Sequence, residues 1–376
     1  MKVVINALSQ VGAGSRTYLS NVLPRLTRMD PSTSYTILWP GSEPWPADVS
    51  NRGNLTFVEV NLPQKPAILR LSYEQVVMPF LADGGDILFA PVDVGPVCSS
   101  VPLVLAIRNP NPFFDVSSRP LITRISLLCK RALISLSARR AAKVIFVSEY
   151  SRSHIVPQIG VPAARTLVIY HGIDHHRFNS EVGLDCQSSD GDQPARRYIL
   201  CVSTITWHKN FEVLLKGYAM LPESLRADYD LVMAGRVAVR GYHERLKRLV
   251  TELGVDNSVH FLGEYPYDRI ETLYKGASVY VLPSLLETFG HTLVEAMASG
   301  LPIIASRISC IPEIVGEAGL LFDPYSPEEL TSRLASVLSE DGTRTRLVRA
   351  GQLRSKDFSW DKTTQGLVEL FHSLGE

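Results

Sequence analysis

The sequence has few cysteines and no long apolar run. Its 376 residues contain five cysteines, an odd number, scattered singly without a C-x-x-C pair. This pattern predicts free thiols in a reducing compartment and argues against a disulfide framework. No apolar run reaches the roughly 20 residues that a membrane-spanning helix needs. The first residues run straight into a predicted strand, so we expect no signal peptide and a cytoplasmic protein.

The sequence also lacks an excess of charge of either sign. Lys and Arg together number 38, and Asp and Glu together also number 38. This balance gives no general attraction for nucleic acid, and we expect no nucleic-acid partner. The length is sufficient for two domains, each with a substantial core.

Short apolar runs alternate with helical stretches along both halves of the chain. Most runs are continuously apolar, which predicts parallel sheets covered on both faces in an α/β architecture. A segment rich in Ser, Asp, Gly and Gln at residues 179–196 predicts a linker between domains at 1–178 and 197–376. The predicted strands are 2–7, 35–39, 56–60, 86–90, 103–107, 144–148, 167–170, 198–202, 231–234, 259–262, 279–282, 303–306 and 320–322.

Two carboxylates lie eight residues apart in the stretch that follows the predicted strand 279–282. Glu287 precedes the turn at Gly290, and Glu295 lies within a predicted helix at 291–299. A helix N-terminus suits a phosphate, and a glycine lets a ligand approach the backbone closely. Carboxylates on either side can accept hydrogen bonds from sugar hydroxyls, so a nucleotide sugar would fit. The alternative is a capped α/β crossover whose acids only face solvent.

The loop after the predicted strand 198–202 carries a lysine immediately before a predicted helix at 211–220. Lys209 can place its ammonium on the phosphate that a helix N-terminus attracts, although a lone loop lysine is more often solvated. Two glycines that end later strands, Gly235 and Gly263, are candidate nucleobase contacts.

A glycine-rich turn follows the first predicted strand. Gly12 and Gly14 could cradle phosphates at the start of a helix, as in a nicotinamide-binding loop. That reading fails because Thr17 occupies the third glycine position and the strand 35–39 ends without an acid for a ribose. An ordinary tight turn between strand and helix remains the alternative.

The segment from Arg119 to Lys143 contains seven basic residues and no acid, interleaved with leucines and isoleucines. A basic and apolar helix can lie on an anionic membrane surface. The alternative, which we favour slightly, is a helix that faces the core and exposes a solvated basic side.

The stretch around the two glutamates has the form Glu287-x-Phe289-Gly290 followed by Glu295-Ala296-Met297-Ala298-x-Gly300-x-Pro302. It resembles the E-x7-E signature of the retaining glycosyltransferases of family 4, within the group 1 glycosyltransferases. The resemblance implies a GT-B fold, in which two Rossmann-like doubly wound domains face a cleft. It further implies an N-terminal acceptor domain, a C-terminal donor domain, and a last helix at 357–376 that packs back on the first.

The resemblance also implies roles for single residues. Glu287 would contact the donor sugar, Glu295 the ribose and Lys209 the diphosphate. Two positions depart from the usual pattern: Ser203 replaces a common Arg, and Arg108-Asn109 replaces a frequent His-Asp pair, as in one subgroup. We therefore expect the catalytic residues Glu287, Lys209, Arg108 and Asn109, and donor-binding residues Gly12, Gly14, Ser203, Lys209, Gly235, Gly263, Glu287, Phe289, Gly290, His291, Thr292, Leu293 and Glu295.

The implied activity is transfer of a sugar, with retention, from a UDP- or GDP-sugar to a saccharide or lipid-linked acceptor. Such a protein would serve bacterial polysaccharide or glycolipid assembly, without a metal and without any cofactor besides the donor substrate. Two other classes remain open. One is a two-domain sugar-binding protein without turnover, and the other is a nucleotide-sugar isomerase on the same fold.

Overall fold

The computed structural model describes most of the chain, and its contacts divide the chain into two compact units. The first unit comprises Met1–Gly172 together with Trp360–Glu376, and the second comprises Ile173–Ser359. The unit boundary therefore precedes the predicted linker, which lies outside the described residues except for Arg196. The described residues are 1–8, 13–41, 53–62, 67–114, 121–178 and 196–375.

The first unit is built on a seven-stranded sheet with strand order β3-β2-β1-β4-β5-β6-β7. Each neighbouring pair is parallel, as the continuous apolar runs predicted. The strands are β1 (Lys2–Asn6), β2 (Ser34–Pro40), β3 (Leu55–Val60), β4 (Ile87–Ala90), β5 (Leu103–Ile107), β6 (Lys143–Phe146) and β7 (Thr166–Val168).

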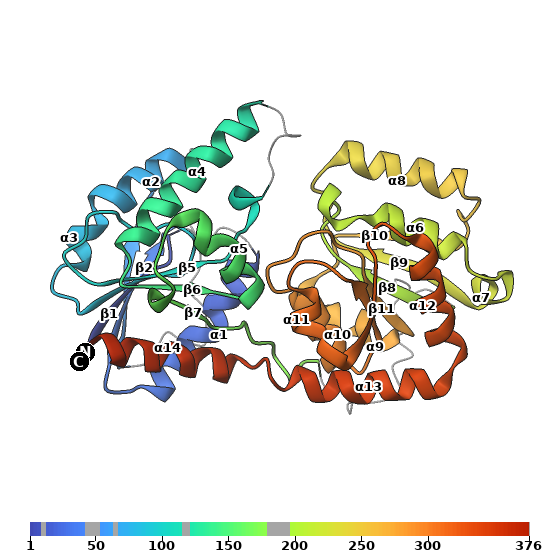
Figure 1. Ribbon diagram of the computed structural model, residues 1–376. Helices are drawn as coiled ribbons and strands as arrows, with labels where there is room; N and C mark the ends of the chain where they lie inside the picture. The colour runs from blue at the N-terminus through green and yellow to red at the C-terminus, as the bar shows by residue number, and fades with distance from the viewer. Residues whose placement is uncertain (9–12, 42–52, 63–66, 115–120, 179–195, 376) are drawn as a thin grey trace. The chain divides into compact units, whose positions relative to one another are not determined.

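Helices cover both faces of this sheet (Figure 1). Successive side chains of a strand point to opposite faces, so each strand contributes to two cores. Val3 and Ile5 of β1 pack in one core with α1 and α14, whereas Val4 packs in the other with α3, α4 and α5. The helices are α1 (Ala13–Met29), α2 (Ala67–Val76), α3 (Met78–Ala82), α4 (Leu121–Arg140), α5 (Glu149–Ile159) and α14 (Trp360–Gly375), with short 3-10 helices at Asn111–Phe113 and Ala163–Arg165.

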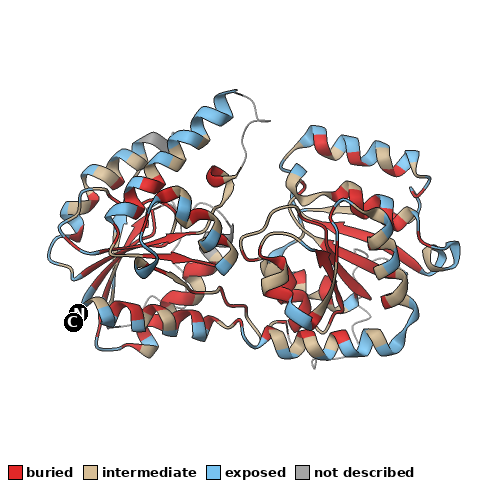
Figure 2. Cartoon of the chain, viewed as in Figure 1, coloured by how far each residue is buried: buried red, intermediate tan, exposed pale blue. Residues whose placement is uncertain are grey.

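The second unit is built on a six-stranded parallel sheet with strand order β10-β9-β8-β11-β12-β13. Its central strands are red in Figure 2, because every residue of β9, β11 and β12 is buried. The strands are β8 (Arg197–Val202), β9 (Tyr229–Ala234), β10 (Val259–Gly263), β11 (Val279–Leu282), β12 (Ile303–Ser306) and β13 (Gly319–Phe322).

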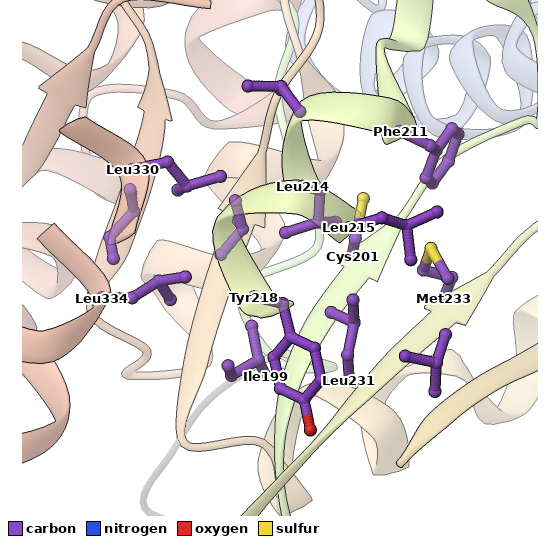
Figure 3. Packing of buried hydrophobic residues seen from close by; sticks show 14 of the residues in the cluster. Ile199, Cys201, Phe211, Leu214, Leu215, Tyr218, Leu231, Met233, Leu330 and Leu334 are labelled. Atoms are coloured by element: carbon purple, nitrogen blue, oxygen red, sulfur yellow. The ribbon is translucent and has the colours of Figure 1, made fainter. Parts of the chain in front are cut away.

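One core of the second unit packs α6 and α12 against β8 and β9 (Figure 3). Phe211, Leu214 and Tyr218 of α6 are fully buried there, beside Leu330 and Leu334 of α12. The helices are α6 (Phe211–Ala219), α7 (Glu223–Asp228), α8 (Arg240–Glu252), α9 (Ile270–Gly276), α10 (His291–Ala298), α11 (Ile311–Val315), α12 (Pro327–Ser339) and α13 (Asp341–Ser355), with 3-10 helices at Trp207–Lys209, Tyr267–Arg269 and Gly316–Ala318.

The last helix, α14, packs on α1 within the first unit. Leu367 and Phe371 are fully buried, and the Phe371 ring lies 5.5 Å from that of Phe89 on β4. At the end of the helix, His372 Nε2 lies 3.0 Å from Asp30 Oδ2. Asp30 itself is 4% exposed, so its charge depends on these neighbours. Burial pushes the pKa of Asp30 up, but hydrogen bonds from side chains that include Ser32, His372 and Tyr35 outweigh it and lower the pKa to about 2.

We expect Asp30→Asn to lower the free energy of unfolding at neutral pH by about 2 kcal/mol, because one pKa unit corresponds to about 1.4 kcal/mol. A depressed pKa stabilises the fold above the unfolded value of 3.8, and this contribution disappears as pH falls toward about 2. Urea denaturation of both proteins between neutral and acidic pH measures the difference.

The matched control is Asp361→Asn, which also removes an acid that ties α14 to α1. Asp361 pairs with Arg25 at 2.8 Å, but its side chain is 56% exposed. Exposed pairs contribute at most about 1 kcal/mol. A smaller loss for Asp30→Asn than for Asp361→Asn would contradict the assignment.

Candidate functional site

The loops that carry the predicted donor residues flank one point of the second sheet. The strand order reverses between β8 and β11, which are adjacent although many residues separate them in sequence. Such a reversal is the topological switch point at which open α/β sheets bind ligands, beyond the carboxyl ends of the strands. The loops after β8 and β11 also contact one another, since the Leu285 N–H donates to the His208 carbonyl at 2.8 Å.

Lys209 and Glu287 meet between these two loops. Lys209 Nζ lies 2.5 Å from Glu287 Oε1, and the two side chains are only 15% and 14% exposed. Ser309 holds the backbone of Glu287, because its Oγ accepts from the Glu287 N–H at 3.1 Å. The sequence predicted both residues as site residues but assigned them to different parts of the donor. The structure makes them direct partners.

The helix α10 begins at the turn beside this ion pair. Gly290 is its N-cap with φ of +82°, a left-handed conformation that favours glycine. No side chain caps this N-terminus among the described residues, so the positive end of its dipole suits a phosphate. Phe289 and Leu293 are buried and pack the turn onto the unit. His291 contacts the Phe289 ring, and Thr292 follows it in the first turn of α10.

Glu295 lies farther along α10 in a buried pocket of phenols. It is 6% exposed and accepts a hydrogen bond from Tyr274 at 2.9 Å and a longer one from Tyr267 at 3.4 Å. The Arg177 guanidinium lies 4.3 Å from the centre of the Tyr267 ring. Burial raises the pKa of Glu295, although both phenols and the Arg177 charge oppose the increase. Burial is the main cause that raises the pKa of Tyr280. Nearby charges, including those of Glu295 and Glu287, raise it further.

The residues Tyr274, Tyr267 and Arg177 were missed by the reasoning from sequence. They come from α9, from the 3-10 helix before it and from the start of the second unit. Nothing in their spacing distinguishes them from ordinary aromatic and basic residues. Only the fold brings them to Glu295.

Three further candidates lie together at the same edge of the second sheet. The Gly235 N–H donates to the Gly263 carbonyl at 2.7 Å, and the Ser203 N–H donates to the Ala234 carbonyl at 2.9 Å. A Cβ on Gly235 would lie 2.0 Å from the Ser203 carbonyl oxygen, so only glycine fits this approach. The three loops after β8, β9 and β10 are therefore locked together beside the switch point.

The remaining candidates lie in the first unit. Gly14 is in the first turn of α1, and Gly12 lies outside the described residues. Arg108 and Asn109 follow β5, and the Arg108 guanidinium lies 4.3 Å from the centre of the Tyr18 ring. Burial lowers the pKa of Arg108, and the charges of Tyr18 and Asp93 oppose the decrease. The backbone N–H groups of Arg108 and Asn109 both donate to Asp93 Oδ1, at 2.9 and 3.0 Å.

The basic segment forms α4, which packs on the core through Ile134 and Ala138 and exposes Arg124, Arg139 and Arg140, as in the alternative that we favoured. Lys130 pairs with Asp93 at 3.1 Å, Arg139 Nε donates to the Ile159 carbonyl, and Lys143 Nζ donates to the Ala164 carbonyl. The exposed side also carries apolar residues, with Leu121 at 69% and Ile122 at 84% exposure. The sequence could not show that some of these basic side chains have partners within the unit. Other exposed apolar residues of α4 are Ile125, Leu128 and Leu136, and Arg119 lies outside the described residues.

No group of three or more His, Cys, Asp and Glu side chains among the described residues suits a metal ion. No helix in the described part of the chain combines the length and the hydropathy that crossing a bilayer requires.

Residues 189–354 match the family described as glycosyl transferases group 1. The O-antigen chain mannosyltransferase B of Escherichia coli is 28% identical over 236 residues, which are 62% of this chain and 61% of that protein. An uncharacterized glycosyltransferase of Methanocaldococcus jannaschii is 31% identical over 247 residues, which are 64% of this chain and 62% of that protein. The chain thus matches these two curated relatives over about three fifths of their length.

Among solved structures, the Anabaena protein HepE in complex with UDP-glucose is similar with a TM-score of 0.73. The sequences are 19% identical, and the match covers 99% of this chain and 100% of that one. This likeness and the two parallel α/β units define a GT-B fold, which confirms the predicted fold class. The matched segment fills most of the second unit, which is therefore similar to the group 1 glycosyl transferases.

Proposed function

We propose that the chain is a glycosyltransferase that moves a sugar from a nucleotide-diphosphate donor to an acceptor hydroxyl, with retention at the anomeric carbon. The observation that carries this proposal is the Lys209–Glu287 pair at the switch point, beside the uncapped N-terminus of α10. A largely buried cation next to a helix N-terminus without a side-chain cap suits a diphosphate, and a carboxylate at the same point suits a sugar hydroxyl.

Breaking the bond between the sugar and the diphosphate builds negative charge on the departing phosphate. Fixed donors aimed at that charge lower the barrier. A lysine ammonium has three N–H donors, and Glu287 engages one of them, so two can reach phosphate oxygens. Glu287 thus has two proposed tasks, to orient the reacting sugar and to hold Lys209 in place.

Glu295 is proposed to accept hydrogen bonds from the ribose hydroxyls. Its buried, phenol-bonded carboxylate is a rigid acceptor, because Tyr274 fixes one oxygen. The nucleobase would lie near Gly235 and Gly263, whose loops are joined at the same edge. The solved relative with bound UDP-glucose supports a UDP-sugar or a similar nucleotide sugar as donor.

The acceptor is proposed to be a saccharide or a lipid-linked saccharide in polysaccharide or glycolipid assembly. The name of the Escherichia coli mannosyltransferase supports this class of acceptor. The assignment of retention depends on the E-x7-E resemblance of the motif that contains Glu287 and Glu295.

We expect the two glutamates to affect different kinetic constants. Glu295→Gln should raise the KM for the donor by roughly ten- to a hundred-fold with little change in kcat, because a charged hydrogen bond contributes about 1.5–3 kcal/mol to ground and transition states alike. Glu287→Gln should mainly lower kcat, because positive charge grows on the sugar that it contacts and because it holds Lys209. Steady-state kinetics at saturating acceptor separate the two.

The pH dependence and a double variant are the controls. The wild-type donor KM should approach that of Glu295→Gln as pH falls, and earlier than an ordinary glutamate would allow, because burial raises the pKa of Glu295. Since Lys209 and Glu287 touch, the effects of Lys209→Met and Glu287→Gln on kcat should be non-additive. Wild-type kinetics in both glutamate variants would remove this motif from the active site.

We propose that no metal takes part, because Lys209 and the N-terminus of α10 supply positive charge where a cation would otherwise lie. Turnover of the donor should then persist in excess EDTA at the rate measured without it. Activity that disappears in EDTA and returns with Mg²⁺ or Mn²⁺ would contradict the charge assignment.

We also propose peripheral contact of α4 with an anionic membrane through its exposed apolar side, flanked by the exposed Arg124 and Arg140. Because apolar burial at about 25 cal/mol per Å² would dominate this contact, Ile122→Glu should abolish vesicle co-sedimentation. Arg140→Glu should only weaken it, since one basic residue near such a surface contributes about 1 kcal/mol. Equal pelleting of wild type and Ile122→Glu would reject the contact.

A further inference from the structure

The first sheet has its own topological switch point, between β1 and β4. A cavity of about 470 Å³ opens beside the loop that follows β4, between α2 and α4. Because open α/β sheets bind ligands at such points, the position itself suggests a ligand site. Its polar lining comes from α2, from the loop and from α4, with Arg70, Glu74, Asp93, Ser126, Cys129 and Lys130.

Hydrogen bonds fix both walls of this cavity to the same loop. The Gly95 carbonyl accepts from Gln75 Nε2 of α2 at 3.1 Å and from Ser137 Oγ of α4 at 2.7 Å. Gln75 also accepts from the Val97 N–H at 2.9 Å. The two helices are therefore held at a set separation, and the cavity is a built feature of the unit.

The charges that line the cavity balance one another. The buried carboxylate of Asp93 pairs with Lys130 at 3.1 Å, and the buried carboxylate of Glu74 lies 3.7 Å from Arg70 Nε. Because each cation faces a carboxylate, the lining has no excess charge to attract a phosphate or another ion. Alternating donors and acceptors above aliphatic walls suit a neutral ligand that carries many hydroxyl groups.

Asp93 joins this cavity to the loop that we predicted as catalytic. Its Oδ2 faces Lys130 in the cavity, while its Oδ1 accepts the N–H groups of Arg108 and Asn109. Its φ of +49° is uncommon for a residue with a side chain. Backbone strain of this kind gathers at functional sites, where the surrounding structure enforces it. A hydroxyl bound at Asp93 would therefore lie next to the start of the Arg108–Asn109 loop.

We propose that this cavity binds a neutral sugar ring of the acceptor, with Asp93 and Lys130 as its polar contacts. The identity of that ligand as the acceptor rests on the proposed function. The presence of a saccharide site in the first unit does not, and it can be tested without turnover.

Two cysteines that are exposed in the described part of the chain provide the test. Cys129 lines the cavity, whereas Cys98 is exposed elsewhere in the same unit. Iodoacetamide labelling of the full chain, followed by peptide mapping, gives the rate at each thiol. Neutral methyl glycosides titrated in the absence of donor should slow labelling of Cys129 and leave Cys98 unchanged, by about tenfold at ten times the dissociation constant. Slowing at both thiols, at neither, or by inorganic phosphate alone would overturn the proposal.

A substitution in the cavity separates this inference from the proposed function. Ser126 lines the cavity and is exposed on α4, so Ser126→Trp can fill the opening without disturbing the core. The matched control is Ala132→Trp, on an exposed position of α4 outside the cavity. Ser126→Trp should abolish glycoside protection of Cys129, measured against the glycoside-free rate of the same variant, and Ala132→Trp should retain it.

If transfer is observed, Ser126→Trp should raise the acceptor KM at least about tenfold, the cost of about 1.4 kcal/mol of lost binding, with an unchanged donor KM. Protection without any transfer would refute the proposed function and leave the saccharide site standing. Transfer with equal acceptor KM in wild type and Ser126→Trp would refute the site.

Discussion

The partly buried ammonium of Lys209 and the partly buried carboxylate of Glu287 form the interaction on which the second unit's site depends. Removing two charges from water is costly, and they persist in the interior only when they are paired in good geometry. Their contact requires the loops after β8 and β11 to meet, and those loops meet because β8 and β11 are neighbours in the sheet. The strand order thus determines which side chains can form an ion pair. It also leaves the N-terminus of α10 beside them, where the backbone adds positive potential.

The same physical rule operates in each unit considered by itself. A parallel sheet that reverses its strand order leaves a crevice beyond the carboxyl ends of two strands, and polar side chains there are held by loops. In the second unit the crevice carries an ion pair and an uncapped helix. In the first unit it carries Asp93, which binds Lys130 on one oxygen and two backbone N–H groups on the other. Both sites satisfy buried charge locally, but their linings differ and suit different ligands.

The basic side chains of α4 show that pairing within a unit changes the chemical character of the surface that remains exposed. A count of its basic residues suggests a cationic face, yet Lys130 and Arg139 bind groups within the unit. What remains outside includes apolar residues, of which Ile122 is the most exposed. Isolated apolar residues on a surface are ordinary, but several along one helix form a patch suited to a contact. The helix therefore packs Ile134 and Ala138 in the core, exposes apolar and basic residues, and lines a cavity with Cys129 and Lys130.

The sequence by itself determined the secondary structure and the fold class. Every predicted strand is present with ends that differ by no more than two residues, because continuous apolar runs bounded by glycine and polar residues carry that information locally. It also located the turn at Gly290 and the start of α10, since a glycine before a helical run is a local feature. The choice of Lys209 and Glu287 came from a motif resemblance.

Only the tertiary structure decided which side chains touch. No periodicity in the sequence predicts the pairing of Lys209 with Glu287 or the cluster of Tyr274 and Tyr267 around Glu295, because the partners lie on different elements. The role of Asp93 was equally invisible, since an isolated aspartate after a strand is common. Contacts of this kind depend on strand order and on helix packing, which arise from the whole chain burying its apolar surface. A local pattern of residues therefore does not predict these contacts.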